Sequence, residues 1–66
     1  MSDEPAVLRH FDDIAAQFRH QPVEQAAAAV TAHLRQFWEP RMRAQLVSQV
    51  TVPSGDPLLD AVVAEL

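Results

Sequence analysis

Five prolines set the lengths of the helices that this chain can form: Pro5, Pro22, Pro40, Pro53 and Pro57. Proline is accepted in the first turn of a helix, but further inside it removes a hydrogen bond and clashes with the preceding turn. The chain also has eleven alanines and a single glycine, a balance that favours helix. We therefore predict an all-α fold, a small bundle of three to four short helices.

The length of 66 residues limits how large a core this chain can bury. We expect residues 1–66 to form a single helical domain. A chain of this size buries only about 60% of its unfolded surface, so its own core is marginal. Small scaffolds usually add disulfides, a metal or a partner. Because the sequence has no cysteine, neither a disulfide nor a thiolate metal site is available, and we expect the domain to be docked on a larger partner.

The first helix is expected between Pro5 and His20. Its apolar residues recur at helical spacing: Val7, Phe11, Ile14 and Phe18. The charged residues lie away from this stripe: Arg9, Asp12, Asp13 and Arg19. This pattern is typical of an amphipathic helix with one solvated face. Ser2 or Asp3 can cap its first turn, where Asp3 and Glu4 also suit the positive end of the helix dipole.

The second helix is predicted from Pro22 to about Trp38. Its main apolar stripe contains Val23, Ala26, Ala27, Val30, Leu34 and Phe37. The opposite side carries almost no charge: Gln25, Ala28, Ala29, Ala32 and Gln36. Exposed helix faces normally carry charge, so one interpretation is contact with a second body. The other is that alanine is present only for its helix propensity.

Two further helices are expected after Pro40, because the residue before a proline avoids the α conformation. The third helix covers residues 40 to about 50 and places three apolar side chains on one side: Met42, Leu46 and Val50. Residues 51–55 are typical of a turn or connector. Asp56 and Pro57 indicate the start of the last helix, with an acceptor at the cap and proline just inside it. This last helix is too short to be stable alone, so it must pack on another element.

No catalytic or metal-binding constellation is recognisable in the sequence. The histidines are His10, His20 and His33, and no two have the spacing of three or four residues that would place both on one metal. Asp12 and Asp13 point about 100° apart on a helix, so they cannot act together as an acid–base pair. There is no G-x-S-x-G turn and no glycine-rich phosphate loop. We predict no catalytic, cofactor-binding or metal-binding residue, and no enzyme activity in this chain.

Charge and hydropathy restrict the class of partner. The formal net charge is −4, whereas nucleic-acid-binding domains carry a basic excess. No apolar run approaches the ~20 residues of a membrane-spanning helix, and the first residues lack the pattern of a secretory signal. We expect a cytoplasmic protein without a membrane or nucleic-acid partner.

Residues 33–43 contain the densest group of side chains that are typical of protein interfaces. They include the only tryptophan, one of three phenylalanines and three of the five arginines. Tryptophan and arginine dominate interface hot spots, and methionine packs adaptably beside them. The candidate partner-interface residues, which we call the patch, are His33, Arg35, Phe37, Trp38, Arg41, Met42 and Arg43.

Several members of the patch have more than one interpretation. Phe37 continues the apolar stripe of the second helix, so we expect it to anchor the core. Trp38 lies at the edge of that stripe and fits either a pocket of a partner or the core of this chain. His33 borders the stripe and is expected to pack there or to form a hydrogen bond at an interface. Arg41 and Arg43 point in different directions on a helix, so at least one should face outward.

The patch lies within the stretch Ala32-His33-Leu34-Arg35-x-Phe37-Trp38-x-Pro40-Arg41-Met42-Arg43. This stretch resembles the signature of the NAD-dependent formate dehydrogenase delta subunit family. The resemblance extends back to the helix ending at Phe18 and forward to Gly55-Asp56-Pro57-Leu58-Leu59, so it covers most of the chain. Such delta subunits are short, helical, cysteine-free accessory chains of soluble bacterial molybdenum-containing formate dehydrogenases.

The resemblance implies a non-catalytic accessory subunit that stabilises the catalytic subunit or assists its assembly in a hetero-oligomer. The implied partners are the large molybdenum-binding catalytic subunit and its electron-transfer subunits. It also implies that those larger subunits hold the molybdenum pterin cofactor, iron–sulfur clusters, FMN and NAD, and this chain none. The docking residues would then be Arg35, Trp38, Arg41 and Arg43, with His33 beside them.

Two other hypotheses remain open at the level of sequence. The first is a small helical regulator that binds nucleic acid through Arg35, Arg41 and Arg43, with an affinity that falls steeply with salt. The second is a free-standing homo-oligomeric bundle, which sedimentation of the isolated chain would reveal. The accessory-subunit hypothesis predicts instead that the isolated chain is weakly folded.

Overall fold

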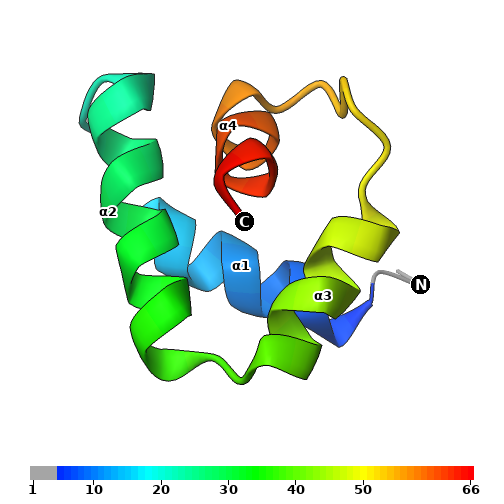
Figure 1. The fold of residues 1–66 in the computed structure, drawn as a ribbon. Coiled ribbons are helices and arrows are strands. Elements are labelled where there is room, and N and C mark those ends of the chain that lie inside the picture. The colour runs from blue at the N-terminus through cyan, green and yellow to red at the C-terminus, as the bar shows by residue number, and fades with distance from the viewer. Residues whose placement is uncertain (1–4) are drawn as a thin grey trace.

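The computed structural model describes residues 5–66, which form four helices and no strand (Figure 1). The helices are α1 (Ala6–Ala16), α2 (Val23–Phe37), α3 (Pro40–Gln49) and α4 (Pro57–Glu65). The predicted all-α fold of three to four short helices is confirmed. A proline stands at the start of every helix, in the cap or in the first turn: Pro5, Pro22, Pro40 and Pro57.

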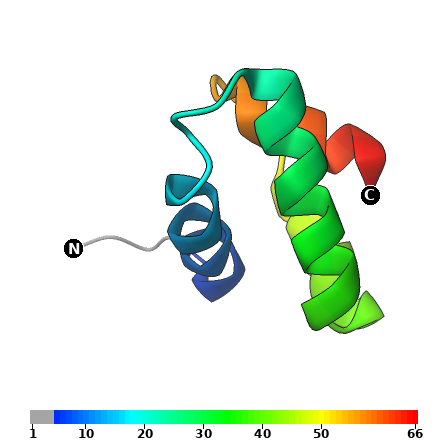
Figure 2. The same cartoon turned by 90° about the vertical axis from the view of Figure 1, so that its left-hand side faces the viewer.

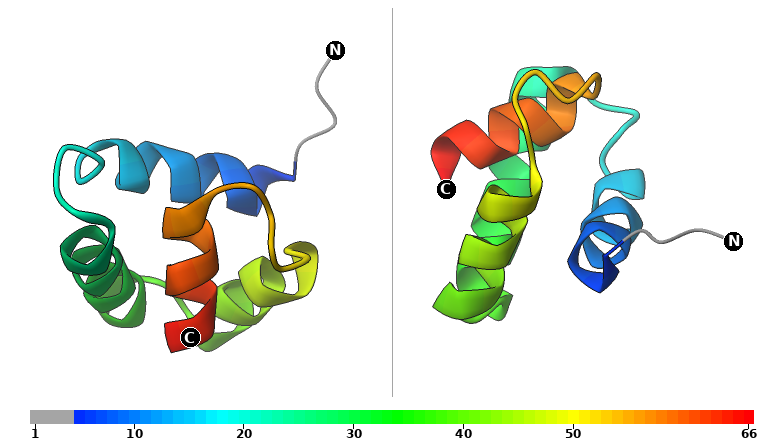
Figure 3. Two further views of the ribbon diagram at one scale, coloured as in Figure 1. Left: turned by 90° about the horizontal axis from the view of Figure 1, so that it is seen from above. Right: turned by 90° about the vertical axis from the view of Figure 1, so that its right-hand side faces the viewer.

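One hydrophobic core joins the four helices. Its largest fully buried side chains come from all of them: Phe11, Val30, Leu34, Leu46 and Val62. Helix α4 packs mainly on α2, and Figures 1 and 3 show it in the middle of the other three helices. Packing thus stabilises a helix that is too short to persist alone, as the sequence predicts.

Helix α1 is shorter than the sequence predicts. The apolar spacing indicated a helix up to His20, but α1 ends at Ala16 and the chain continues in tighter turns. The N–H of Phe18 donates to the carbonyl three residues earlier at 2.9 Å, and its ring packs half-buried against the core. These turns redirect the chain before Pro22, where the preceding residue avoids the α conformation. The residues predicted to start α1 lie outside the described part of the chain: Ser2, Asp3 and Glu4.

The prediction that Pro40 separates two helices is confirmed. Helix α2 ends at Phe37, and Trp38 has an extended backbone with φ −90° and ψ 144°. Glu39 is extended as well, with φ −69° and ψ 153°, and α3 starts directly at Pro40. The apolar side of α3 faces the core as predicted: Met42, Leu46 and Val50.

Helix α4 begins at its predicted cap. The carboxylate of Asp56 accepts hydrogen bonds from the N–H groups of Leu58 at 3.1 Å and Leu59 at 3.4 Å. Gly55, just before the cap, has φ +94°, a conformation that only glycine adopts at little cost. The predicted connector between α3 and α4 is therefore confirmed.

The lengths of the helices determine whether any of them could cross a membrane. Within residues 5–66, no helix is both long and apolar enough to traverse a bilayer. The longest, α2, has 15 residues. The cytoplasmic location stays a prediction.

Candidate partner interface

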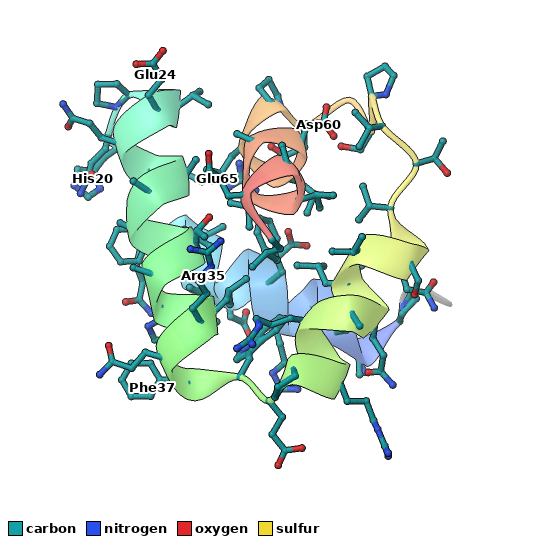
Figure 4. The ribbon with its side chains drawn as sticks, viewed as in Figure 1. His20, Glu24, Arg35, Phe37, Asp60 and Glu65 are labelled. Atoms are coloured by element: carbon teal, nitrogen blue, oxygen red, sulfur yellow. The ribbon has the colours of Figure 1, made fainter. Side chains whose placement is uncertain are left out.

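Phe37 is the most exposed large hydrophobic side chain of residues 5–66, with 65% of its surface accessible. The prediction that it anchors the core is wrong. Its sequence position does continue the apolar stripe, but Figure 2 shows α2 diverging from α1 toward the C-terminal end of α2. The last turn therefore extends past the core, and in Figure 4 the ring of Phe37 projects away from the other helices.

A histidine one turn earlier contacts this exposed ring. His33 is half-buried, and its ring centroid lies 4.6 Å from that of Phe37, with 41° between the planes. Residues four apart lie on the same side of a helix, and tilted aromatic pairs at such distances attract each other. Of the two roles expected for His33, the structure shows packing. The contact restricts the orientation of a ring that solvent would otherwise leave free.

Trp38 and Met42 are both half-buried and pack against the core. The tryptophan therefore contributes to the interior of this chain, which was one of its two expected positions. It is not fully enclosed, so part of the indole stays accessible at the corner between α2 and α3. These two residues connect the core to the exposed surface around Phe37.

Two arginines of the patch cap helix ends within the chain. Arg43 Nη1 donates to the carbonyl oxygens of Trp38 at 2.9 Å and Arg35 at 3.2 Å, at the end of α2. Arg35 Nη2 donates to the carbonyl oxygen of Glu65 at the end of α4, and Figure 4 places these two residues close together. Carbonyls of a last helical turn lack helical partners, and a cation there also suits the helix dipole. Both arginines therefore have a structural role.

Arg41 differs from these two arginines. It is exposed and makes no hydrogen bond or ion pair with any of residues 5–66. The prediction that Arg41 or Arg43 faces outward is thus confirmed, and the residue is Arg41. It leaves one positive charge at the start of α3, next to the exposed end of α2.

The outer face of α2 carries no charged side chain. We use this name for the arc of the helix that contains Gln25, Ala29, Ala32, His33, Gln36 and Phe37. Ala29 and His33 are half-buried, and the others are exposed. Ala32 on this arc therefore does not pack in the core, unlike Ala26 and Ala27. The structure leaves a neutral helix surface that ends in an aromatic ring.

An ion pair that the sequence did not indicate joins the turn after α1 to the start of α4. Arg19 Nη2 donates to Asp56 Oδ2 at 2.8 Å, and Nη1 donates to Oδ1 at 3.2 Å. These bonds from Arg19, helped by the N–H groups that Asp56 caps, hold the pKa of the Asp56 carboxyl below its usual value, although partial burial opposes this. The same contact raises the pKa of Arg19. No local pattern could reveal a pair separated by 37 positions.

The donor set of the chain does not fit the metal groups that the resemblance implies for the complex. Among residues 5–66, no three histidine, aspartate or glutamate side chains are grouped so that they could hold a metal ion. Iron–sulfur clusters are held by cysteine thiolates, and this sequence has no cysteine.

Comparison with known protein families gives a match over most of the chain. The family of FdsD, the NADH-dependent formate dehydrogenase delta subunit, matches residues 8–65 of the 66. That range includes the whole patch and nearly all of the four helices. No curated protein and no solved structure matches the chain. Because the family match spans almost the entire sequence, the chain belongs to the family of formate dehydrogenase delta subunits.

Proposed function

We propose that this chain is a non-catalytic accessory subunit that binds the catalytic subunit of a formate dehydrogenase and stabilises it or assists its assembly. The observation that carries the proposal is the family match over residues 8–65. A delta subunit belongs to a complex with other subunits, so a binding surface is required. The patch supports this role because it exposes the ring of Phe37 and the guanidinium of Arg41.

The polar contacts of the chain support binding rather than catalysis. The best-defined ones cap helix ends or join elements, as in the bonds of Arg35, Arg43 and the Arg19–Asp56 pair. An active site instead needs such groups to be available to a substrate. We place the molybdenum pterin, iron–sulfur, FMN and NAD sites in the other subunits, in keeping with the lack of cysteine here.

The nucleic-acid hypothesis loses support from the same contacts. Of its three arginines, Arg35 and Arg43 already donate to carbonyl oxygens of helix ends. The net charge of −4 would also repel a phosphate backbone. Both observations disfavour binding of nucleic acid by this chain.

Co-expression tests the proposal. The full-length chain is produced with the catalytic subunit, which carries the affinity tag, and with the other subunits of the same formate dehydrogenase. We expect the chain to co-purify, and the complex made without it to melt at a lower temperature, because a ligand of the folded state stabilises it. If the complex lacks the chain, or if the complex made without it assembles in the same yield and melts unchanged, the proposal is wrong. Formate oxidation per bound molybdenum should stay unchanged when the chain is removed after assembly.

A further inference from the structure

We propose that the outer face of α2, with Phe37 at its end, is the surface that docks on the catalytic subunit, and that it occupies an uncharged, apolar groove there. This inference rests on the proposed function, which supplies the partner. The geometry of α2 and the chemistry of its exposed side chains point to the face and to the kind of groove that fits it.

The first argument is surface area. A stable protein contact takes about 800 Å² from each partner, which is roughly a fifth of the 4488 Å² that this chain exposes. Such an area requires a continuous face rather than a single side chain. Helix α2 is the longest element, with 15 residues and therefore a length of about 22 Å. Its outer face is the longest continuous surface that one element of residues 5–66 offers.

The second argument is charge complementarity. The chain has nine acidic and five basic side chains, yet none of them belongs to the outer face of α2. Glu24 and Arg35 lie at its edge and Arg41 lies beyond its end, so charged side chains are found only at the rim. A charged groove would lose its hydration against this face without gaining an ion pair. An uncharged groove has no charged groups whose hydration would be lost on contact. The face therefore selects a neutral partner surface.

The third argument concerns Phe37 itself. Aromatic side chains that enter a well-packed pocket supply much of the binding energy of an interface. The contact with His33 already orients the ring, so docking orders fewer degrees of freedom. The alanines of the face lose no rotamer entropy and allow the wall of a groove to approach the helix closely. Phe37 would then act as the anchor at one edge of the face, and Ala29 and Ala32 would contact the wall of the groove.

The other exposed hydrophobic side chains do not form such a face. Val52 is 56% accessible but lies in the connector between α3 and α4. Val23 is 45% accessible and lines a groove of about 180 Å³ beside the Arg19–Asp56 ion pair. Val47 is 39% accessible and lies on α3, a helix of ten residues that also exposes Arg41. None of these three residues continues into an uncharged helix surface. Val52 is consequently a suitable control for Phe37.

The experiment compares Phe37→Ala with Val52→Ala in the full-length chain. Each purified variant is titrated onto the formate dehydrogenase complex that was prepared without the delta chain, and the dissociation constant is measured. We expect Phe37→Ala to weaken binding about thirtyfold and Val52→Ala less than threefold. Circular dichroism should show the same helix content for both variants, because both side chains are largely exposed.

The outcomes separate this inference from the proposed function. If the unmodified chain binds but Phe37→Ala binds within threefold of it, the docking surface is elsewhere and the inference is wrong. If the unmodified chain does not bind at all, the proposed function fails. If the chain alone sediments as a dimer that Phe37→Ala dissociates, a second copy covers the face and the inference is also wrong.

Discussion

Helices α1 and α2 contribute similar apolar stripes to one core but present different surfaces to their surroundings. The inner face of α1 buries Val7, Phe11 and Ala15. The inner face of α2 buries Ala26, Ala27, Val30, Thr31 and Leu34. Outside, α1 exposes charged side chains: Arg9, Asp12 and Asp13. The outer face of α2 exposes alanine, glutamine, part of His33 and the ring of Phe37, and the charged side chains of this helix, Glu24 and Arg35, are exposed beside that face.

This difference in charge indicates which of the two helix surfaces is better suited to remain exposed to water. Charged side chains are favourable in solvent and costly to bury without partners, so the outer side of α1 is suited to hydration. Burying the outer face of α2 against a partner would not require any charged side chain to lose its hydration. Two helices of one small bundle thus separate two tasks: α1 completes the core and faces solvent, and α2 completes the core and remains available to a partner.

The largest effect is expected where the two helices are alike, on their inner faces. Phe11→Ala and Leu34→Ala each remove a fully buried side chain. Such truncations cost about 3 kcal/mol or more, against a total stability of roughly 3–10 kcal/mol for a chain of this length. Thermal melts followed by circular dichroism should show both variants melting well below the unmodified chain. A cooperative melt close to that of the unmodified chain would contradict the buried positions of these residues.

The second prediction concerns the outer faces, where the helices differ. Ala32→Glu places a charge in the middle of the outer face of α2, whereas Ala6→Glu places one on the exposed first turn of α1. We expect Ala32→Glu to weaken binding to the formate dehydrogenase complex by about 2 kcal/mol, roughly thirtyfold, because the carboxylate would be desolvated without a partner. Ala6→Glu should bind normally, and glutamate is a good helix former in both variants. Equal binding by the two variants would remove the distinction between the faces.

The order and bounds of the helices could be predicted well from the sequence. Which side chains of the patch are exposed could be predicted less well. Proline positions and apolar spacing are local, so three of the four helices begin and end close to their predicted bounds. The exposure of Phe37 depends on where the neighbouring helices end, and no pattern within α2 contains that information. The roles of Arg35 and Arg43 are likewise tertiary, since Arg35 bonds to Glu65 thirty positions away. The neutral side of α2 was visible in the sequence, but only the structure shows it uncovered.

The third prediction concerns the ion pair that fixes the start of α4 beside the end of α1. Asp56→Ala removes both the helix cap and the acceptor of Arg19, whereas Asp56→Asn keeps a capping oxygen and loses the ion pair. Loss of a cap costs about 1 kcal/mol, and the half-exposed ion pair adds less. Urea unfolding should therefore rank the variants, with Asp56→Ala least stable and Asp56→Asn intermediate. If Asp56→Asn were as unstable as Asp56→Ala, the charge rather than the cap would dominate.

The same carboxylate gives the stability a defined dependence on pH. The pKa of Asp56 is lowered in the folded chain, mainly by the hydrogen bonds from Arg19. Its contribution is therefore fully present above the unfolded pKa of about 3.9 and is lost as the pH falls through the lower folded value. Melting temperatures measured from pH 6 down to pH 2 should fall less steeply below about pH 4 for Asp56→Asn than for the unmodified chain. Parallel curves would show that Asp56 is not the residue that titrates.

The smallest effect is expected from the one polar residue on the inner face of α2. Thr31 is only 4% exposed, and its hydroxyl has no hydrogen-bond partner among residues 5–66, whereas the inner face of α1 buries no polar side chain. A buried hydroxyl without a partner is unfavourable, so the isosteric Thr31→Val should raise stability by about 1 kcal/mol, or the melting temperature by roughly 4–8 °C. Thr31→Ser, which keeps the hydroxyl and loses a methyl group, should lower it. If Thr31→Val were destabilising, the hydroxyl would have to donate to a carbonyl of the preceding turn. The inner face of α2 would then, like that of α1, contain no polar group without a partner.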